Sequence, residues 1–205
     1  MHSAEAALSA GFDGVELHGA NGYLLDQFLN IASNTRNDNY GGSADNRNRF
    51  VIEVAEAVAN AIGKDKVGIR LSPFGAFNEM SSDDTTEDQY TKLAASLKKV
   101  GIVYIHIVDH SSMGSPAVPQ SVKDGIRNAF GGNIILSGGY DAERAEADLE
   151  AGKGELVAFG RPFISNPDLI EKIQSGEELV TPDSTTFYTT GEKGYTDYAE
   201  VLQVA

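Results

Sequence analysis

The chain has 205 residues, 41% of them apolar and 22% charged, so it is long enough for one medium domain and too hydrophobic for intrinsic disorder. Its 16 basic and 30 acidic residues give a net charge of −14, which repels phosphate backbones and anionic membrane surfaces and argues against nucleic acid as a partner. The absence of cysteine excludes disulfides, thiolate nucleophiles and cysteine-bound metals, and no apolar run approaches the roughly 20 residues of a membrane span.

The first part of the chain predicts a helix, a strand and a longer helix. A helix is expected from Ser3 to about Ala10, and residues 14–17 form a short apolar run typical of buried strands. A second helix is predicted between Ser43 and Gly63, because apolar residues recur there at a spacing of four: Phe50, Val54, Val58 and Ile62.

Strands and helices continue to alternate in the rest of the chain. Further buried strands are predicted at residues 67–71, 103–107, 134–137 and 156–160. Thr86 and Gln89 form a predicted capping box at the start of a helix that Gly101 ends, and Asp141 and Asn166 each begin another helix. This alternation indicates parallel pairing in an α/β fold, either an open doubly wound sheet or a (β/α) barrel.

A group of polar residues follows the first predicted strand, in the segment His18-Gly19-Ala20-Asn21-Gly22-Tyr23. Ligands of parallel α/β folds bind at the carboxyl ends of the strands. A neutral histidine and an asparagine amide can together hold a carbonyl oxygen that gains negative charge, and a nearby tyrosine can deliver a proton. This chemistry fits the conjugate reduction of an activated alkene. In the alternative reading, His18 is a half-buried histidine with satisfied hydrogen bonds and Tyr23 is a core aromatic residue.

Long segments of the chain carry a family resemblance. They are GFDGVELHGANGYLLDQFL at residues 11–29, NTRNDNYGGS at 34–43 and NRNRF at 46–50. Shorter matching segments follow in the same order, at residues 70–73, 77–78, 137–139, 159–169, 186–188 and 194–198. Together these segments resemble the old yellow enzyme family of flavin-dependent ene reductases. The resemblance implies an FMN-containing (β/α)8 barrel that takes hydride from NADPH or NADH. It passes the hydride through the flavin to the C=C bond of an α,β-unsaturated carbonyl or nitro compound.

The resemblance also implies roles for residues of the substrate site. His18 and Asn21 would bind the carbonyl or nitro oxygen of the substrate, and Tyr23 would give a proton to its α-carbon. Phe77 and Tyr188 would line the substrate and nicotinamide pocket. Either aromatic residue could equally belong to an ordinary core.

Residues expected to bind FMN are spread over the second half of the chain. By resemblance they are Arg70, Gly138, Gly139, Gly160, Arg161 and Phe187. Glycines at strand ends let backbone N–H groups approach a phosphate, and an arginine can pair with it. Arg70 lies in an apolar strand and needs an acceptor, for which the alternative partner is a neighbouring carboxylate. No metal site is expected.

The segment from Thr35 to Phe50 is expected to stabilise a loop and helix rather than to touch the substrate. The residues expected to do so are Arg36, Asp38, Arg47 and Arg49. His106 lies on a predicted strand, and the sequence leaves open which face of the sheet its side chain occupies. The His110-Ser111-Ser112 run does not have partners at the spacing of a catalytic triad.

The resemblance starts at the fourth barrel strand, so the chain predicts a partial (β/α)8 barrel of about five units. We expect one domain over residues 1–205, with residues 180–205 as a tail packed on it. Five strands leave unpaired sheet edges, so a partner chain, a missing segment or self-association is expected to complete the barrel.

Two other functions remain as alternatives. The chain could be a catalytically incomplete subunit with an assembly role. Aldolase or isomerase chemistry is disfavoured, because no lysine lies at a strand end where a Schiff base would need one. The N-terminus lacks the features of a signal peptide, so we expect a cytoplasmic protein.

Overall fold

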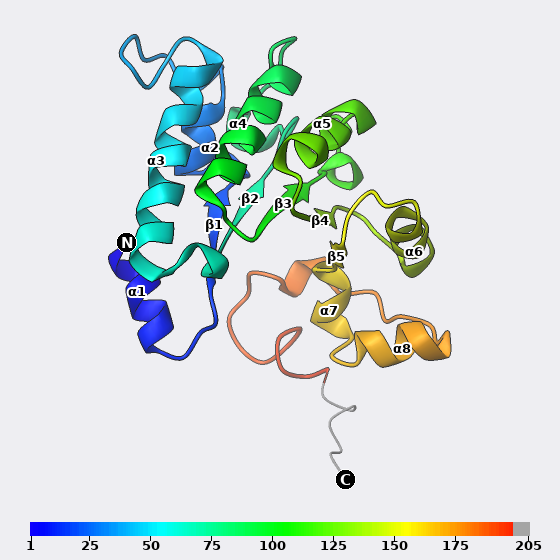
Figure 1. The fold of residues 1–205 in the computed structure, drawn as a ribbon. Helices are drawn as coiled ribbons and strands as arrows, with labels where there is room; N and C mark the ends of the chain where they lie inside the picture. Colours follow the sequence, from blue (N-terminus) through cyan, green and yellow to red (C-terminus); the bar gives the residue numbers. More distant parts are fainter. Residues whose placement is uncertain (199–205) are drawn as a thin grey trace. The chain divides into compact units, whose positions relative to one another are not determined.

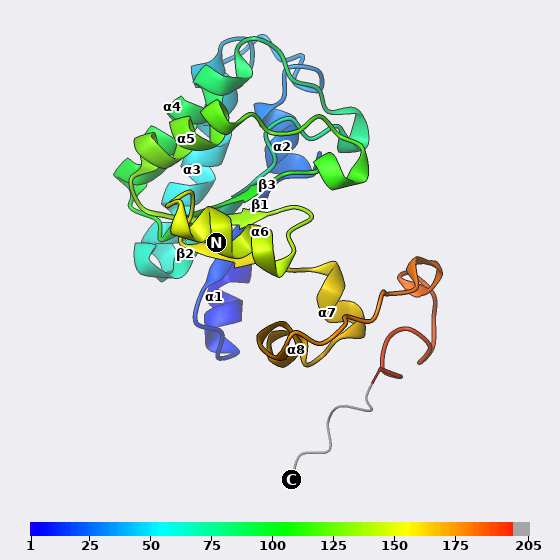
Figure 2. The same ribbon diagram turned by 90° about the vertical axis from the view of Figure 1, so that its right-hand side faces the viewer.

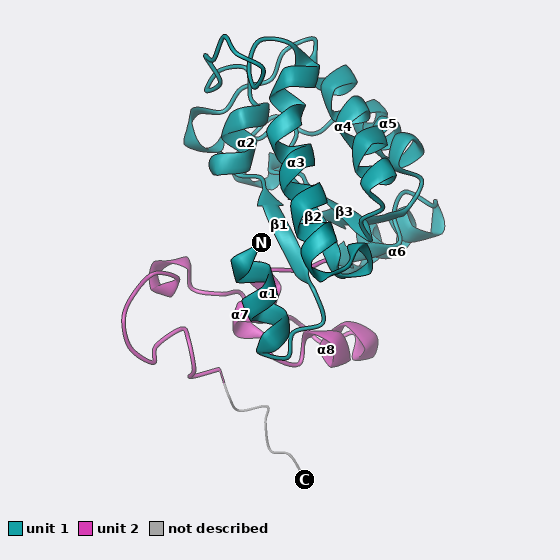
Figure 3. Ribbon diagram, turned by 60° about the vertical axis from the view of Figure 1, so that its left-hand side comes forward, with its two compact units in different colours: residues 1–157 teal, residues 158–205 magenta. Residues whose placement is uncertain are grey.

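The structure, a computed structural model, describes residues 1–198 and divides into two compact units. They comprise residues 1–157 and 158–205, coloured teal and magenta in Figure 3. The one-domain organisation and the packing of the tail from residue 180 stay predictions, and residues 199–205 of that tail lie outside the described residues. No helix within the described part of the chain is both long and apolar enough to cross a membrane.

A five-stranded sheet runs through the chain in sequential order, β1-β2-β3-β4-β5. The strands are β1 (Val15–Gly19), β2 (Val67–Leu71), β3 (Tyr104–Val108), β4 (Asn133–Ser137) and β5 (Leu156–Ala158). The first four pair in parallel with their neighbours. Sequential parallel order requires a crossover between each pair of strands, and helices supply it.

Six helices belong to the first unit. They are α1 (His2–Ser9), α2 (Leu24–Leu29), α3 (Ala44–Ile62), α4 (Thr86–Val100), α5 (Gln120–Phe130) and α6 (Ala142–Glu150). The second unit contains α7 (Arg161–Ser165) and α8 (Leu169–Ser175). The hydroxyl of Ser43 caps α3 by accepting a hydrogen bond from the backbone of Asn46 at 3.3 Å, and a left-handed Gly101 ends α4.

The two faces of the sheet differ in polarity, because side chains alternate along each strand. One face is fully apolar and carries the core residues Ile69, Leu71, Ile105, Ile107, Ile134 and Leu136, each at most 2% exposed. Figures 1 and 2 show α3, α4 and α5 along this part of the sheet, and α3 contacts β2. The other face carries a row formed by His18, Arg70, His106 and Ile135 on adjacent strands. Polar groups are therefore gathered on the face that α3 to α5 do not cover.

The observed boundaries correct several predicted ones. β1 extends to Gly19, so His18 lies on the strand and not after it. β5 ends at Ala158, and Gly160 is the residue before α7 rather than the end of a strand. The strand prediction at 67–71 is confirmed, and so is the helix between Ser43 and Gly63.

The predicted capping box of α4 is wrong. The residue before the helix is Thr85, and no side chain caps the helix there. The amide nitrogen of Gln89 instead donates to the backbone oxygen of Leu29 at 2.7 Å and to Asn48 at 3.1 Å. These partners are far away in sequence, and they take the amide that the capping box needed.

The segment from Thr35 to Phe50 makes the structural contacts expected of it. Arg47 is 3% exposed and donates to the backbone oxygen of Leu29 at 3.0 Å and to Gln89 at 2.6 Å. Arg36 pairs with Asp38, and Arg49 donates to the backbone oxygen of Asn39 at 2.8 Å. These arginines join the loop to α2, α3 and α4.

Candidate active site

The loop after β1 has an unusual backbone that only a few residue types can adopt. Asn21 and Gly22 have left-handed φ angles of 61° and 70°. Asparagine tolerates this region, and glycine enters it freely. A Cβ atom on Gly22 would lie 2.6 Å from the Cβ of Asn78 and 2.8 Å from the backbone oxygen of Phe77. The turn therefore requires glycine at position 22, and this turn places Asn21 and Tyr23 beside the end of β1.

Asn21 is held by groups from three later segments of the chain. Its backbone N–H donates to the hydroxyl of Ser72 at 2.8 Å, just after β2. Its backbone oxygen accepts from the amide of Asn78 at 2.9 Å, in the short 3-10 helix Phe77–Glu79. The Nε2 atom of His110, after β3, lies 2.6 Å from the side-chain oxygen Oδ1 of Asn21. The position of Asn21 thus depends on the segments that follow β2 and β3.

A buried carboxylate lies beneath this loop. Asp26 is 1% exposed and accepts hydrogen bonds from the backbone of Gly22 at 2.9 Å, from Ser72 at 3.2 Å and from Tyr90 at 3.4 Å. Burial raises the pKa of Asp26, and these hydrogen bonds partly oppose the shift. Asp26 and Ser72 together tie the loop to α2 and β2.

His18 and Tyr23 lie next to each other at the carboxyl end of β1. Their ring centroids are 5.3 Å apart and the rings are tilted by 43°. Burial and the positive charge of Arg70 lower the pKa of His18, and Glu16 opposes this shift. The imidazole is therefore neutral at pH 7 and has one N–H to donate. Tyr23 is 53% exposed, so this residue is not part of the buried core.

Arg70 is the neighbour of His18 in the row on the polar face of the sheet. Its Nε atom is buried and has no hydrogen-bond partner within the described part of the chain. Burial lowers the pKa of Arg70, and the negative charge of Glu16 only partly opposes this shift. The carboxylate of Glu16 hydrogen-bonds instead to Nδ1 of His106 at 3.0 Å. Buried N–H groups are normally hydrogen-bonded, so this guanidinium N–H needs an acceptor that the described residues do not provide.

The second neighbour of Arg70 in the row, His106, links two strands. Its Nε2 atom lies 2.8 Å from the hydroxyl oxygen of Ser137. That hydroxyl donates a hydrogen bond to the backbone oxygen of Ile107 at 3.3 Å. Burial raises the pKa of Glu16, but hydrogen bonds from His106 and Tyr104 outweigh it and the pKa is lowered. The hydroxyl hydrogen of Ser137 is engaged by the backbone, so this group is a structural network rather than a nucleophile and base.

The glycines after β4 are explained first by close packing. Gly138 and Gly139 have φ angles of 122° and 63°. A Cβ atom on Gly138 would collide with the backbone oxygen of Asp109, and one on Gly139 would lie 2.7 Å from the Cβ of Ser112. These contacts account for both glycines without a ligand. Their predicted approach to a phosphate stays a prediction.

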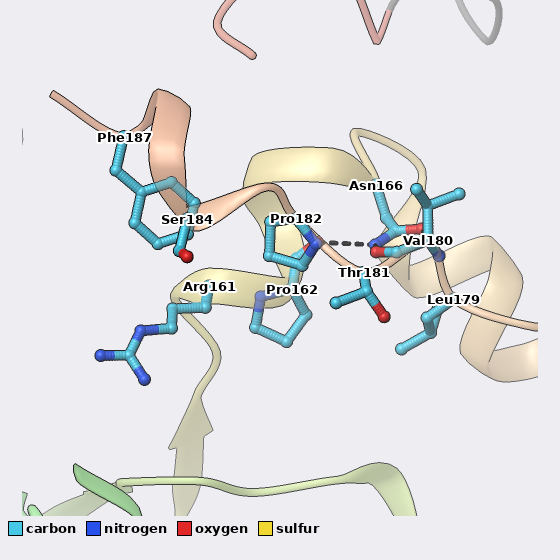
Figure 4. Close-up of a pocket in the computed structure, with 9 residues that line it drawn as sticks. All are labelled: Arg161, Pro162, Asn166, Leu179, Val180, Thr181, Pro182, Ser184 and Phe187. Carbon is cyan, nitrogen blue, oxygen red and sulfur yellow. Dashed lines mark hydrogen bonds between the residues drawn. The ribbon is translucent and has the colours of Figure 1, made fainter. Parts of the chain in front are cut away.

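The remaining predicted residues belong to the second unit or to an exposed turn. A pocket of about 410 Å³ in the second unit is lined by Arg161, Phe187 and other residues drawn in Figure 4. Asn166 is fully buried at its edge and hydrogen-bonds to the backbone of Val180 through both ends of its amide, at 2.9 Å each. Tyr188 is 99% exposed and Phe77 is 53% exposed. The structure therefore brings His18, Asn21, Tyr23 and Arg70 together in the first unit, and it places Arg161 and Phe187 around one pocket of the second.

The sequence did not predict four residues that contact Asn21 or its loop: Asp26, Ser72, Asn78 and His110. Asp26, Ser72 and Asn78 lie inside the matching segments, which was an available signal. The sequence around His110 shows only that it has no partners at the spacing of a catalytic triad.

The sequence model of the NADH:flavin oxidoreductase / NADH oxidase family matches residues 1–179. The chain belongs to this family. It is 46% identical over 200 residues to the putative 12-oxophytodienoate reductase 11 of Oryza sativa subsp. japonica, covering 96% of this chain and 54% of the relative. It is 42% identical over 196 residues to a probable flavin mononucleotide-dependent alkene reductase of Leishmania infantum, covering 96% of this chain and 53% of the relative.

The fold of the chain is also similar to that of a solved structure. An old yellow enzyme homologue from Zymomonas mobilis has a TM-score of 0.90 and 36% identity, covering 96% of this chain and 56% of that chain. The resemblance to old yellow enzymes and the α/β partial-barrel fold are thus confirmed. The chain spans about half the length of the relatives it matches.

Proposed function

We propose that the chain carries the substrate-activating half of an FMN-dependent ene reductase. The substrate is an α,β-unsaturated carbonyl or nitro compound, and NADPH or NADH is the reductant. The observation that carries this proposal is the grouping of His18, Asn21 and Tyr23 at one end of β1, with a neutral imidazole and a firmly held asparagine. Family membership supports the redox class.

The residues present fit a flavin. The buried Nε of Arg70 has no hydrogen-bond partner among residues 1–198 and lies in the row beside His18, where the oxygen and nitrogen acceptors of an isoalloxazine edge would satisfy it. Arg161, with a fixed positive charge, is suited to a phosphate. FMN, when bound, supplies hydride to the β-carbon of the substrate.

The side chains of the chain itself then do three things. The N–H of His18 and the amide nitrogen of Asn21 donate hydrogen bonds to the substrate's carbonyl or nitro oxygen, so that they stabilise the negative charge that develops there. The Tyr23 hydroxyl gives its proton to the α-carbon, and the tyrosinate recovers a proton from solvent. Hydride and proton together saturate the C=C bond.

We also propose that additional strands complete the sheet beside β1. The only strand neighbour of β1 among the described residues is β2, and Glu16 and His18 on β1 are exposed. An unpaired edge with a polar row needs cover. A second chain, a further segment or a second copy could supply it.

The test uses the 205-residue chain mixed with excess FMN and separated by size exclusion. We expect a flavin-bearing fraction, with absorbance at about 450 nm as is general for bound flavins, that NADPH bleaches under anaerobic conditions and 2-cyclohexenone reoxidises. The elution volume shows whether this fraction is a monomer or an oligomer. A flavin-bearing fraction that does not reduce the enone would contradict the proposal and favour the assembly role.

A further inference from the structure

The amide of Asn21 can face a substrate in two ways. One end, Oδ1, only accepts hydrogen bonds, and the other, Nδ2, only donates them. The two orientations differ by a half-turn of the side chain and occupy the same volume. Only the orientation that presents Nδ2 stabilises a substrate oxygen. The reaction proposed above therefore needs a group that selects this orientation.

His110 is placed to make that selection. Its Nε2 atom lies 2.6 Å from Oδ1 of Asn21, and because Oδ1 cannot donate, Nε2 must carry the hydrogen. The backbone N–H and oxygen of Asn21 are already engaged by Ser72 and Asn78, so the main chain cannot rotate to compensate. The remaining freedom of Asn21 is its side chain, which His110 holds by the accepting end.

The backbone around His110 is itself well anchored. The backbone oxygen of His110 accepts from Met113 at 2.8 Å, which begins the 3-10 helix Ser111–Met113. The preceding residue, Asp109, is 4% exposed and pairs with Lys123 on α5 at 2.8 Å. The imidazole is thus presented from a turn that is fixed to β3 and α5.

We propose that His110 is a positioning residue for the substrate clamp, which consists of the His18 imidazole and the Asn21 amide that bind the substrate oxygen. Its Nε2–H binds Oδ1 of Asn21 and turns Nδ2 of that amide toward the substrate oxygen. His110 does not touch the substrate or the flavin. This inference rests on the proposed function, because the clamp acquires its purpose from an oxygen-bearing substrate.

The first test measures the tautomer and needs no flavin. The chain is labelled with ¹⁵N-histidine, and the ring resonances of His110 are assigned by their loss in His110→Gln. We expect the hydrogen of the neutral ring on Nε2, and we expect Asn21→Ala to shift that resonance. A neutral ring with its hydrogen on Nδ1, or an Nε2 resonance that Asn21→Ala leaves unchanged, would overturn the proposal.

The second test compares two substitutions at the same position. His110→Leu removes the donor, and the loss of one net hydrogen bond predicts a fall of about three- to tenfold in kcat/KM for 2-cyclohexenone. His110→Gln keeps an N–H donor, and we expect it to recover most of that loss. Flavin content should be equal in all three proteins, because His110 is not expected to contact FMN. Equal kcat/KM for His110→Leu and the unaltered chain would refute the role.

The two tests separate the possible failures. If the unaltered chain binds FMN and does not reduce the enone, the proposed function fails, and the tautomer of His110 still decides whether it orients Asn21. Circular dichroism shows whether His110→Leu folds. If it does not, the resonances of the unaltered chain and the activity of His110→Gln decide whether His110 orients Asn21. Activity of His110→Gln as low as that of Asn21→Ala would count against the proposal.

Discussion

Replacing Asp26 by alanine tests the structural basis of the candidate site. Asp26 is the buried group that joins the loop after β1 to Ser72 and to Tyr90 on α4. Its removal leaves the backbone N–H of Gly22 without its acceptor at the point where the loop turns left-handed. We expect both lower stability and poorer substrate activation.

The size of the stability loss follows from the three contacts. All three hydrogen bonds go to the Asp26 carboxyl group. The one from Gly22 is the shortest at 2.9 Å, and those from Ser72 at 3.2 Å and Tyr90 at 3.4 Å are longer and weaker. Bonds to charged groups contribute about 1.5–3 kcal/mol and ordinary ones about 0.5–1.5 kcal/mol. Burial of the carboxyl group offsets part of this sum, as the raised pKa of Asp26 indicates. We therefore expect Asp26→Ala to lower the free energy of unfolding by about 2–3 kcal/mol.

Urea denaturation followed by circular dichroism measures this loss. With a slope of about 2 kcal/mol per molar urea, the midpoint should fall by about 1 M while the slope stays constant. Tyr90→Phe is the matched control, because it removes only the longest of the three contacts and should cost about 0.5 kcal/mol. A loss below about 0.5 kcal/mol for Asp26→Ala would refute the reasoning, since it would mean that the loop does not depend on this carboxyl group.

The pH dependence of Asp26 provides an independent check. Its pKa is raised in the folded state, so the folded chain holds this proton more tightly than the unfolded chain. The stabilisation from this group is complete below the unfolded pKa of 3.8 and is lost as pH rises through the higher folded pKa. Relative to Asp26→Asn, the unaltered chain should therefore lose stability as pH increases above about 4. The opposite slope would show that Asp26 is ionised and stabilised by its partners.

Three further substitutions test individual parts of the site. His18→Ala removes a donor to the substrate oxygen and should lower kcat/KM for 2-cyclohexenone by about 10²- to 10³-fold, and unchanged steady-state kinetics would exclude His18 from the clamp. Tyr23→Phe keeps the ring beside His18 and removes the proton donor, so kcat should fall by about 10²-fold or more while flavin content stays constant. Gly22→Ala puts a Cβ atom 2.6 Å from Asn78 at a φ of 70°. It should cost about 2 kcal/mol or more, and an unchanged thermal midpoint would contradict the geometry of the turn.

The fold was predictable from the sequence where local pattern determines structure. The apolar run at residues 67–71 coincides with β2, and the spacing-of-four pattern lies within α3. The apolar run at residues 14–17 predicts a strand that ends before His18, whereas β1 extends to Gly19. The structure explains the error: Glu16 and His18 occupy the polar face of the sheet, and the strand continues through them.

Long-range contacts account for most of what the sequence did not reveal. The capping-box pattern at Thr86 was wrong because Gln89 bonds to Leu29, 60 residues earlier. In the candidate site, the motif after β1 identified Asn21 but not the groups that hold it. Those groups lie 51, 57 and 89 residues further along the chain, beyond any local pattern.

The proposed enzyme must both hold the substrate clamp and retain FMN, and different residues serve these two requirements. Among the described residues, the groups that hydrogen-bond to Asn21 are Ser72, Asn78 and His110, and all three belong to the first unit. The hydrogen bonds to Asn21 among residues 1–198 therefore lie within that unit. Arg70 differs, because its buried Nε has no partner among the described residues and needs an acceptor from elsewhere. Loss of barrel closure should consequently weaken FMN retention before it disturbs the substrate clamp, so the orientation of Asn21 should be measurable even in flavin-free protein.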